Sequence, residues 1–154
     1  MESQTVGIEI VTHSRVTITR SPSAIWPHIV EPGAWKQGAQ LVRQGDRIAA
    51  MGPDGTPRFM ADEAELEPEV RRTLRLTGLD GALLGWSMWY LEPIPGGTRV
   101  GYDVYSLIQV PLGDAGGSPE AAAELQRRYQ IISQQRFDAE LEALKRLVEI
   151  AGAP

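Results

Sequence analysis

The sequence predicts one α+β domain in which a curved antiparallel sheet wraps around a single long C-terminal helix. A helical pattern runs without interruption from residue 119 to residue 150, with apolar residues at steps of three and four along one side. Ahead of it, strand-like runs alternate with turn signals rich in glycine, proline and acidic residues. A helix of this length with one apolar side needs a broad apolar surface to lie against, and a sheet supplies one.

The predicted C-terminal helix has a clear start and a clear end. Ser118 is a natural N-cap, Pro119 suits the first helical position, and Gly152 suits the position after the last turn. The apolar stripe consists of Leu125, Tyr129, Ile132, Phe137, Leu141, Leu144 and Val148. We expect the opposite, water-facing side to carry largely Arg127, Arg128, Gln134, Gln135, Glu142, Lys145 and Arg146.

The chain before this helix is expected to begin with one strand and two short helices. Residues 9–19 alternate in polarity, which predicts a strand with one buried face. A Ser-Pro pair at residues 21–22 then gives a cap and a first-turn proline for a short helix. That helix stops at the Pro-Gly pair of residues 32–33, which begins a second turn or short helix that presents Trp35.

Hairpins are expected to follow, to give a sheet of about seven strands in all. The later strands are predicted at residues 41–44, 48–51, 58–66, 70–77, 84–94 and 98–110. Consecutive hairpins make an antiparallel sheet, and the first strand joins it at an edge or across from the last strand. A strongly bent sheet around a long helix leaves space between them, and such a hollow is where small apolar molecules bind.

Composition narrows the classes of function. The 154 residues fit one domain, and no apolar run approaches the roughly 20 residues of a membrane span. The first seven residues lack the features of a secretory signal, so the cytoplasm is the default compartment. Zero cysteines exclude disulfides and thiol catalysis. A net charge of -5 makes nucleic acid an improbable partner.

Several short motifs occur in a characteristic order. They are Val16-Thr17-Ile18 leading into Ser21-Pro22-Ser23-Ala24-Ile25-Trp26, then Trp35, Leu66-Glu67-Pro68, Leu91-Glu92-Pro93 with Gly97-Thr98-Arg99-Val100, and the long helix. Together they resemble the helix-grip superfamily of START, pollen-allergen-like and polyketide cyclase/dehydrase proteins, often grouped as SRPBCC. The resemblance covers about residues 10–148 and implies an internal cavity for lipid-like, steroid, polyketide or aromatic molecules. It does not imply one reaction.

One predicted hairpin, at residues 84–110, holds half of the aromatic residues. A loop of residues 94–97 pairs Trp89 with Tyr102, which leaves Trp86, Met88 and Tyr90 on the other face; a shorter turn exchanges the faces. The resemblance favours the first register, so we predict that Trp89 and Tyr102 point inward, as pocket walls or as plain core. The outward residues then form an apolar patch that suggests a homodimer or another partner contact.

Polar groups on the final helix fall near its buried side, where the apolar stripe drifts. Arg136 and Glu140 are four residues apart and are expected to form an ion pair, which orients a polar group of a ligand or lies on the surface. Tyr129, Ser133 and Phe137 are further pocket candidates.

Charged residues in the predicted hairpin of residues 58–77 are further candidates for contacts with a ligand. Arg72 and Asp62 lie on faces that oppose each other across residues 67–69. If that face is the inner one, the two must be paired, and they anchor the polar end of a ligand; the alternative is a solvated pair at the rim. His13 and His28 are expected on the surface, and no spacing of ligand-type residues suggests a metal.

Three hypotheses follow. The first is a protein that binds a small hydrophobic or aromatic molecule, with no cofactor. Its candidate ligand-binding residues are Trp35, Arg72, Trp89, Tyr102, Tyr129, Ser133 and Phe137. The second is a cyclase, aromatase or dehydratase that acts on a polyketide-like substrate, although no motif singles out a catalytic residue. The third is a protein-interaction module similar to the activator domains of chaperones.

Overall fold

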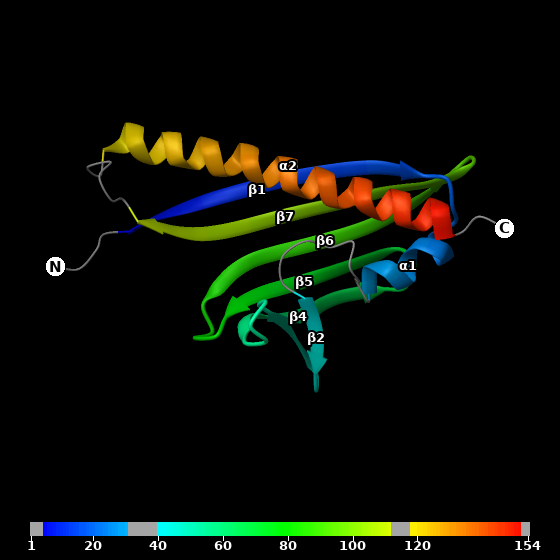
Figure 1. Cartoon of the computed structure of the whole chain (residues 1–154), viewed down its shortest axis with the longest axis horizontal. Helices are drawn as coiled ribbons and strands as arrows, with labels where there is room; N and C mark the ends of the chain where they lie inside the picture. Colours follow the sequence, from blue (N-terminus) through cyan, green and yellow to red (C-terminus); the bar gives the residue numbers. More distant parts are fainter. Residues whose placement is uncertain (1–4, 31–39, 112–117, 152–154) are drawn as a thin grey trace.

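The computed structural model describes residues 5–30, 40–111 and 118–151. The elements are β1 (Thr5–Ile18), α1 (Pro22–Val30), β2 (Gln40–Gln44), β3 (Arg47–Met51), β4 (Pro57–Glu67), β5 (Arg71–Gly78), β6 (Leu83–Ile94), β7 (Gly97–Pro111) and α2 (Pro119–Ala151) (Figure 1). The predicted order of elements is confirmed over these residues. The second short helix and Trp35 fall at residues 31–39, outside the described residues.

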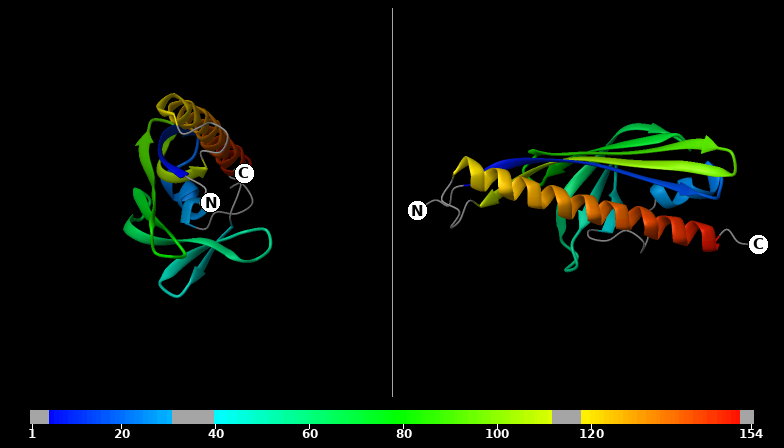
Figure 2. Two further views of the ribbon diagram at one scale, coloured as in Figure 1. Left: turned by 90° about the vertical axis from the view of Figure 1, so that its left-hand side faces the viewer. Right: turned by 90° about the horizontal axis from the view of Figure 1, so that it is seen from above.

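The described strands form one seven-stranded antiparallel sheet in the order β1-β7-β6-β5-β4-β3-β2. Each hairpin places consecutive strands side by side, and β1 closes onto β7, the last strand. The α+β fold is therefore as predicted, with β1 and β2 as the two edges. Seen end-on in Figure 2, the sheet is strongly curved, and α2 runs along its β1 side.

The core lies between the concave face of the sheet, α1 and the second half of α2. Along β1, residues from Ile8 to Ile18 alternate strictly between buried and exposed, so the even-numbered residues face inward. Burial of apolar area in this layer is the main favourable term for folding. The main cluster includes Val16, Ile18, Ile25, Ile29, Trp89, Leu91, Val100, Tyr102, Val104, Leu141, Leu144 and Val148.

The start of α2 is capped as predicted. The N–H of Ala121 donates to the Ser118 hydroxyl oxygen at 3.1 Å, and the N–H of Ala122 donates to the Ser118 carbonyl oxygen at 3.1 Å. These bonds satisfy donors that a helix start otherwise leaves without partners.

The outer edge of β1 is hydrogen-bonded by glutamine side chains from α2. Three glutamines follow one another at steps of four residues along α2, and the strand residues that they bond follow one another at steps of two along β1. The pairs are Gln126 with Glu9, Gln130 with Val11, and Gln134 with His13. Four helical residues advance about 6.0 Å and two strand residues about 6.8 Å, so the two repeats stay in step. We call this row of three residues the glutamine ladder.

The ladder corrects the sequence-based assignment of Gln134 and Lys145 to the water-facing side of α2. Gln134 accepts from the N–H of His13 at 3.2 Å and donates to its carbonyl oxygen at 2.8 Å. Lys145 donates to the Thr17 carbonyl oxygen at 2.9 Å. Helical periodicity shows only that these residues are off the apolar stripe; it does not show that the edge of a strand lies beside them.

We predict that Gln130→Ala lowers the free energy of unfolding by about 1 kcal/mol, because it removes two hydrogen bonds to Val11 at the sheet edge. Urea denaturation followed by circular dichroism measures the change. The control is Gln135→Ala, an exposed glutamine on the same helix, which should change stability by less than about 0.5 kcal/mol. Equal effects of the two substitutions would contradict a structural role for the ladder.

Candidate functional site

A hollow of about 370 Å³ lies between α2 and the concave face of the sheet. Its walls come from α2 and from β2, β4, β5, β6 and β7. The residues that line it are Leu41, Phe59, Leu76, Leu84, Tyr102, Val104, Ser106, Leu107, Ile108, Arg136, Phe137 and Glu140. Most of these side chains are apolar, as expected of a site for a small organic molecule.

One wall of the hollow is built from stacked rings. Tyr102 lies parallel to Trp89, with ring centroids 3.9 Å apart and 15° between the planes, and Phe137 meets Tyr102 edge-on at 5.4 Å. Tyr102 and Phe137 line the hollow, whereas Trp89 backs Tyr102 from the neighbouring strand. The three rings join β6, β7 and α2 into one surface.

The register that sets this wall is the predicted one. Trp89 pairs with Tyr102, and Ile94 pairs with Gly97 across the turn. Gly96 has a φ of 82°, which glycine adopts without strain, and a proline precedes it, as in a type II turn. Both predicted rings are therefore buried inside. That a ligand touches them stays a prediction.

Arg136 and Glu140 form the polar part of the hollow. The Arg136 Nε lies 3.6 Å from a carboxylate oxygen of Glu140, four residues along α2, as the sequence predicted. The Arg136 side chain is 51% exposed and that of Glu140 is 0% exposed, so the pair spans from solvent to the interior. The Arg136 guanidinium also lies 5.8 Å from the centre of the Phe137 ring. Arg136 thus reaches solvent, as the surface alternative predicted, whereas Glu140 is buried beside the hollow.

Several residues that line the hollow were missed by the sequence analysis, including Phe59, Leu76, Leu84, Ser106 and Ile108. They lie on four strands, and only the bending of the sheet brings them together. Their alternation along each strand is the signal that identifies the inner face. Nothing in the sequence shows how far each strand reaches under α2.

Arg72 is buried as a structural residue. Its side chain is 1% exposed, and it donates to Glu63 at 2.7 Å and to the carbonyl oxygen of Ile29, near the end of α1, at 2.9 Å. Burial lowers the pKa of Arg72, and the hydrogen bond and the charge of Glu63 partly counter that effect. Arg72 is not among the residues that line the hollow, and it joins α1 to the sheet.

The predicted pairing of Arg72 with Asp62 is wrong. A β-bulge in β4 between Glu63 and Glu65 shifts the register, so Glu63 reaches the inner face beside Arg72. Asp62 instead bonds Arg47 at 2.8 Å, and this hydrogen bond lowers the pKa of Asp62. The alternative, a solvated pair of Arg72 and Asp62 at the rim, is wrong as well. Arg72 is buried and bonds Glu63 and the carbonyl oxygen of Ile29.

The remaining candidates on α2 lie beside the hollow. Tyr129 is 37% exposed and Ser133 is half-buried, and neither is among the residues that line the hollow. Of the seven predicted ligand-binding residues, the structure thus brings Tyr102 and Phe137 to the hollow, with Trp89 directly behind.

The convex face carries a polar cluster centred on Asp103. Its carboxylate accepts hydrogen bonds from Arg15 at 2.7 Å, from Tyr90 at 3.0 Å, and lies 3.0 Å from His13 Nδ1. Burial tends to raise the pKa of Asp103, but hydrogen bonds from Arg15, His13 and Tyr90 outweigh it and lower the pKa. In the part of the chain that the structure describes, no three histidine or acidic residues come together as metal ligands.

The hollow between a curved antiparallel sheet and a long terminal helix defines the helix-grip fold, of the kind found in polyketide cyclase-like proteins. No protein-family model matches the sequence, and no curated protein matches it at a significant level. Neither helix of the described residues is long and apolar enough to cross a membrane.

Solved structures are similar to this chain in fold. The di-domain ARO/CYC protein StfQ from the steffimycin biosynthetic pathway is 15% identical, with a TM-score of 0.66, over 95% of this chain and 53% of that one. A conserved protein from Geobacillus kaustophilus is 14% identical, with a TM-score of 0.61, over 90% and 95%. The Polyketide_cyc-like protein Cgl2372 from Corynebacterium glutamicum is 13% identical, with a TM-score of 0.60, over 93% of each chain. These likenesses establish the fold.

We predict that Asp103→Asn destabilises the protein near neutral pH and that the difference from wild type shrinks on acidification. The folded-state pKa of Asp103 is lowered, so its stabilising effect is present above the unfolded-state pKa and is lost as pH falls through the folded-state pKa. Urea unfolding at several pH values between about 7 and about 2 measures this. Asp46→Asn, in the exposed turn after β2, is the control; a difference that stays constant with pH would contradict the prediction.

Proposed function

We propose that this protein binds a small, ring-containing apolar molecule in the hollow between α2 and the sheet. The observation that carries the proposal is the hollow itself, at about 370 Å³ and with mostly apolar walls. Ligand sites in proteins typically measure about 300–1,000 Å³ and combine apolar walls with a few polar groups. The fold likeness to polyketide cyclase-like proteins supports the same class of function.

The walls favour an aromatic or fused-ring ligand. Phe59, Tyr102 and Phe137 line the hollow, and rings attract one another in offset or edge-on arrangements. Burial of apolar ligand surface contributes about 25 cal/mol per Å² before the cost of association is subtracted. The hollow is modest in volume, so a compact molecule fits it better than a long acyl chain.

The polar pair gives the ligand an orientation. Arg136 offers donors and Glu140 offers carboxylate acceptors on the same side of the hollow, beside the hydroxyl-bearing Tyr102 and Ser106. A ligand that carries both a carbonyl and a hydroxyl group matches this pair. Its rings would then lie against Phe59 of β4 and Leu76 of β5.

A second candidate function is catalysis of the cyclase, aromatase or dehydratase type. The observation in its favour is Glu140, a fully buried carboxylate that lines the hollow and lies 3.6 Å from a guanidinium group. A carboxylate in such a place suits general acid–base catalysis on an enclosed carbonyl compound. Glu140→Gln keeps the shape and removes the proton acceptor, so an enzyme would lose turnover while it still binds substrate.

A homodimer or another partner contact through the convex face is also proposed. Met88 is 38% exposed there, and Trp86, Tyr90 and Tyr105 are half-buried. On β6 and β7 these residues surround the polar cluster of Asp103, and such a mixture of rings and polar groups suits a contact between proteins.

We predict that the wild-type protein takes up an environment-sensitive aromatic dye saturably and that Ser106→Trp weakens this binding at least about tenfold. Ser106 lines the hollow and is half-buried, so an indole at this position fills the space. Fluorescence titration, repeated by competition with sterols and aromatic polyketides, measures the affinity.

The matched control for this titration is Val42→Trp, at an exposed position on β2 outside the hollow. It adds the same indole and should leave dye binding unchanged. Thermal unfolding of both variants shows that they are folded. No saturable uptake by the wild-type protein, or equal uptake by both variants, would rule out the proposed site.

A further inference from the structure

The glutamine ladder does not reach the first residues of β1. Its first member, Gln126, donates to the carbonyl oxygen of Glu9 at 3.2 Å. One more step of the same repeat places residue 122 of α2 opposite residue 7 of β1. These positions hold Ala122 and Gly7, and neither has a side chain that forms a hydrogen bond.

The backbone of Gly7 faces the open edge of the sheet. Backbone groups alternate in direction along a strand, and Val11 and His13 direct both N–H and C=O to α2, so Gly7 points the same way. Among the described residues, no hydrogen bond from another element reaches the N–H or the carbonyl oxygen of Gly7. An edge with free backbone groups is a template for one more strand.

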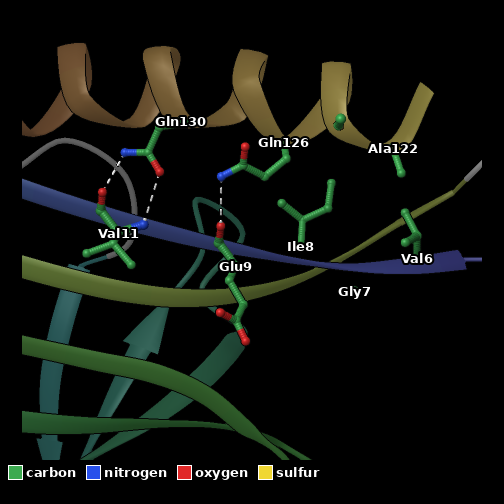
Figure 3. Close-up of a pocket in the computed structure, with 9 residues that line it drawn as sticks. Val6, Gly7, Ile8, Glu9, Val11, Ala122, Gln126 and Gln130 are labelled. Atoms are coloured by element: carbon green, nitrogen blue, oxygen red, sulfur yellow. Dashed lines mark hydrogen bonds between the residues drawn. The ribbon is translucent and has the colours of Figure 1, made fainter. Parts of the chain in front are cut away.

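There is room for a chain at this position. A groove of about 550 Å³ runs between β1 and the first turns of α2, from Val6 to Val11 (Figure 3). Ala122 and Ala123 line it at the start of β1, and Gln126 and Gln130 line the rest. The small side chains of Ala122 and Ala123 are what leaves the space open. Figure 3 shows the ladder bonds of Gln126 to Glu9 and of Gln130 to Val11, with the short side chain of Ala122 beyond them.

The two faces of β1 define the chemistry of an added strand. On the inner face, Val6 and Ile8 are apolar and lie toward α2. On the outer face, Glu9 is exposed, and among the described residues that line the groove it alone is charged. Successive side chains of a strand point to opposite faces, so a matching strand alternates apolar and basic residues.

We propose that the groove beside Val6, Gly7 and Ile8 binds an extended peptide that alternates apolar and basic residues and adds to the sheet next to β1. Backbone bonds to Gly7 hold the peptide, its apolar residues pack on the half-buried Val6 and Ala122, and its basic residues face Glu9. The site is separate from the hollow, and its occupancy does not depend on a ligand there.

The probe for this site is the peptide acetyl-Val-Lys-Val-Lys-Val-amide, added up to millimolar concentration to the labelled full-length protein. Amide chemical shifts and hydrogen exchange, measured by nuclear magnetic resonance, report on each backbone group. We expect shifts that saturate at residues 5–9 and slower exchange of the Gly7 amide. No peptide-dependent change at these residues would overturn the proposal.

Ala122→Gln is the decisive variant, because it extends the ladder by one residue. The new side chain should bond Gly7 itself, slow its exchange without peptide, and weaken peptide binding about tenfold. Ala139→Gln, on the exposed side of the same helix, is the control and should bind the peptide as the wild-type protein does. Equal peptide affinity of Ala122→Gln and the control would overturn the proposal.

Charge and self-association complete the test. Glu9→Lys should weaken binding of the lysine peptide and favour acetyl-Val-Glu-Val-Glu-Val-amide, and a failure of this exchange contradicts the predicted facing of side chains. If Gly7 exchange slows as protein concentration rises without peptide, the strand that occupies the groove comes from a second copy of the chain, and the peptide proposal is overturned.

Discussion

The open edge of β1 is the constraint on which the rest of the structure depends. β1 has one strand neighbour, β7, and its other side carries backbone groups that need partners. Helix α2 supplies them through the glutamine ladder at one end and through Lys145 and Glu149 at the other. Because these bonds recur along the helix, they fix both the position of α2 along β1 and its rotation. The apolar stripe of α2 then has to face the concave side of the sheet.

That fixed rotation divides α2 into segments with different roles. Its last turns bury Leu141, Leu144 and Val148 in the main core, and this packing contributes most of the apolar burial of the helix. In the turn just before Leu141, Arg136, Phe137 and Glu140 face the hollow. The hollow exists because the sheet curves away from α2 beyond β1, whereas β1 stays in close contact with the helix. Both the space and its polar pair thus follow from how the helix is attached.

The fold and the ring wall could be predicted from the sequence because each depends on local rules. The turn at residues 94–97 sets the register of the hairpin, and that register alone places Trp89 and Tyr102 inside. Arg72 shows the limit of such reasoning. One extra residue at the bulge in β4 exchanges the faces of Asp62 and Glu63, and the sequence carries no mark of the bulge. The ladder was missed for a related reason, since periodicity describes one helix and not what lies beside it.

The same logic connects the hollow with the groove at the start of β1. Where α2 offers a long amide side chain, the backbone of β1 is hydrogen-bonded to the helix, and where it offers alanine, no such bond forms among the described residues. A helix that only needed to cover an edge would carry a polar side chain at each step of four, including position 122. The alanines there do not extend the ladder. Leu125 beside them still packs on the cluster of Ile8 and Ile10, so the helix stays attached at this end. Within residues 119–151 it does so without a hydrogen bond to the backbone of Gly7 at the start of β1. Apolar packing holds α2 in place there, and hydrogen bonding to the edge is left to whatever binds in the groove.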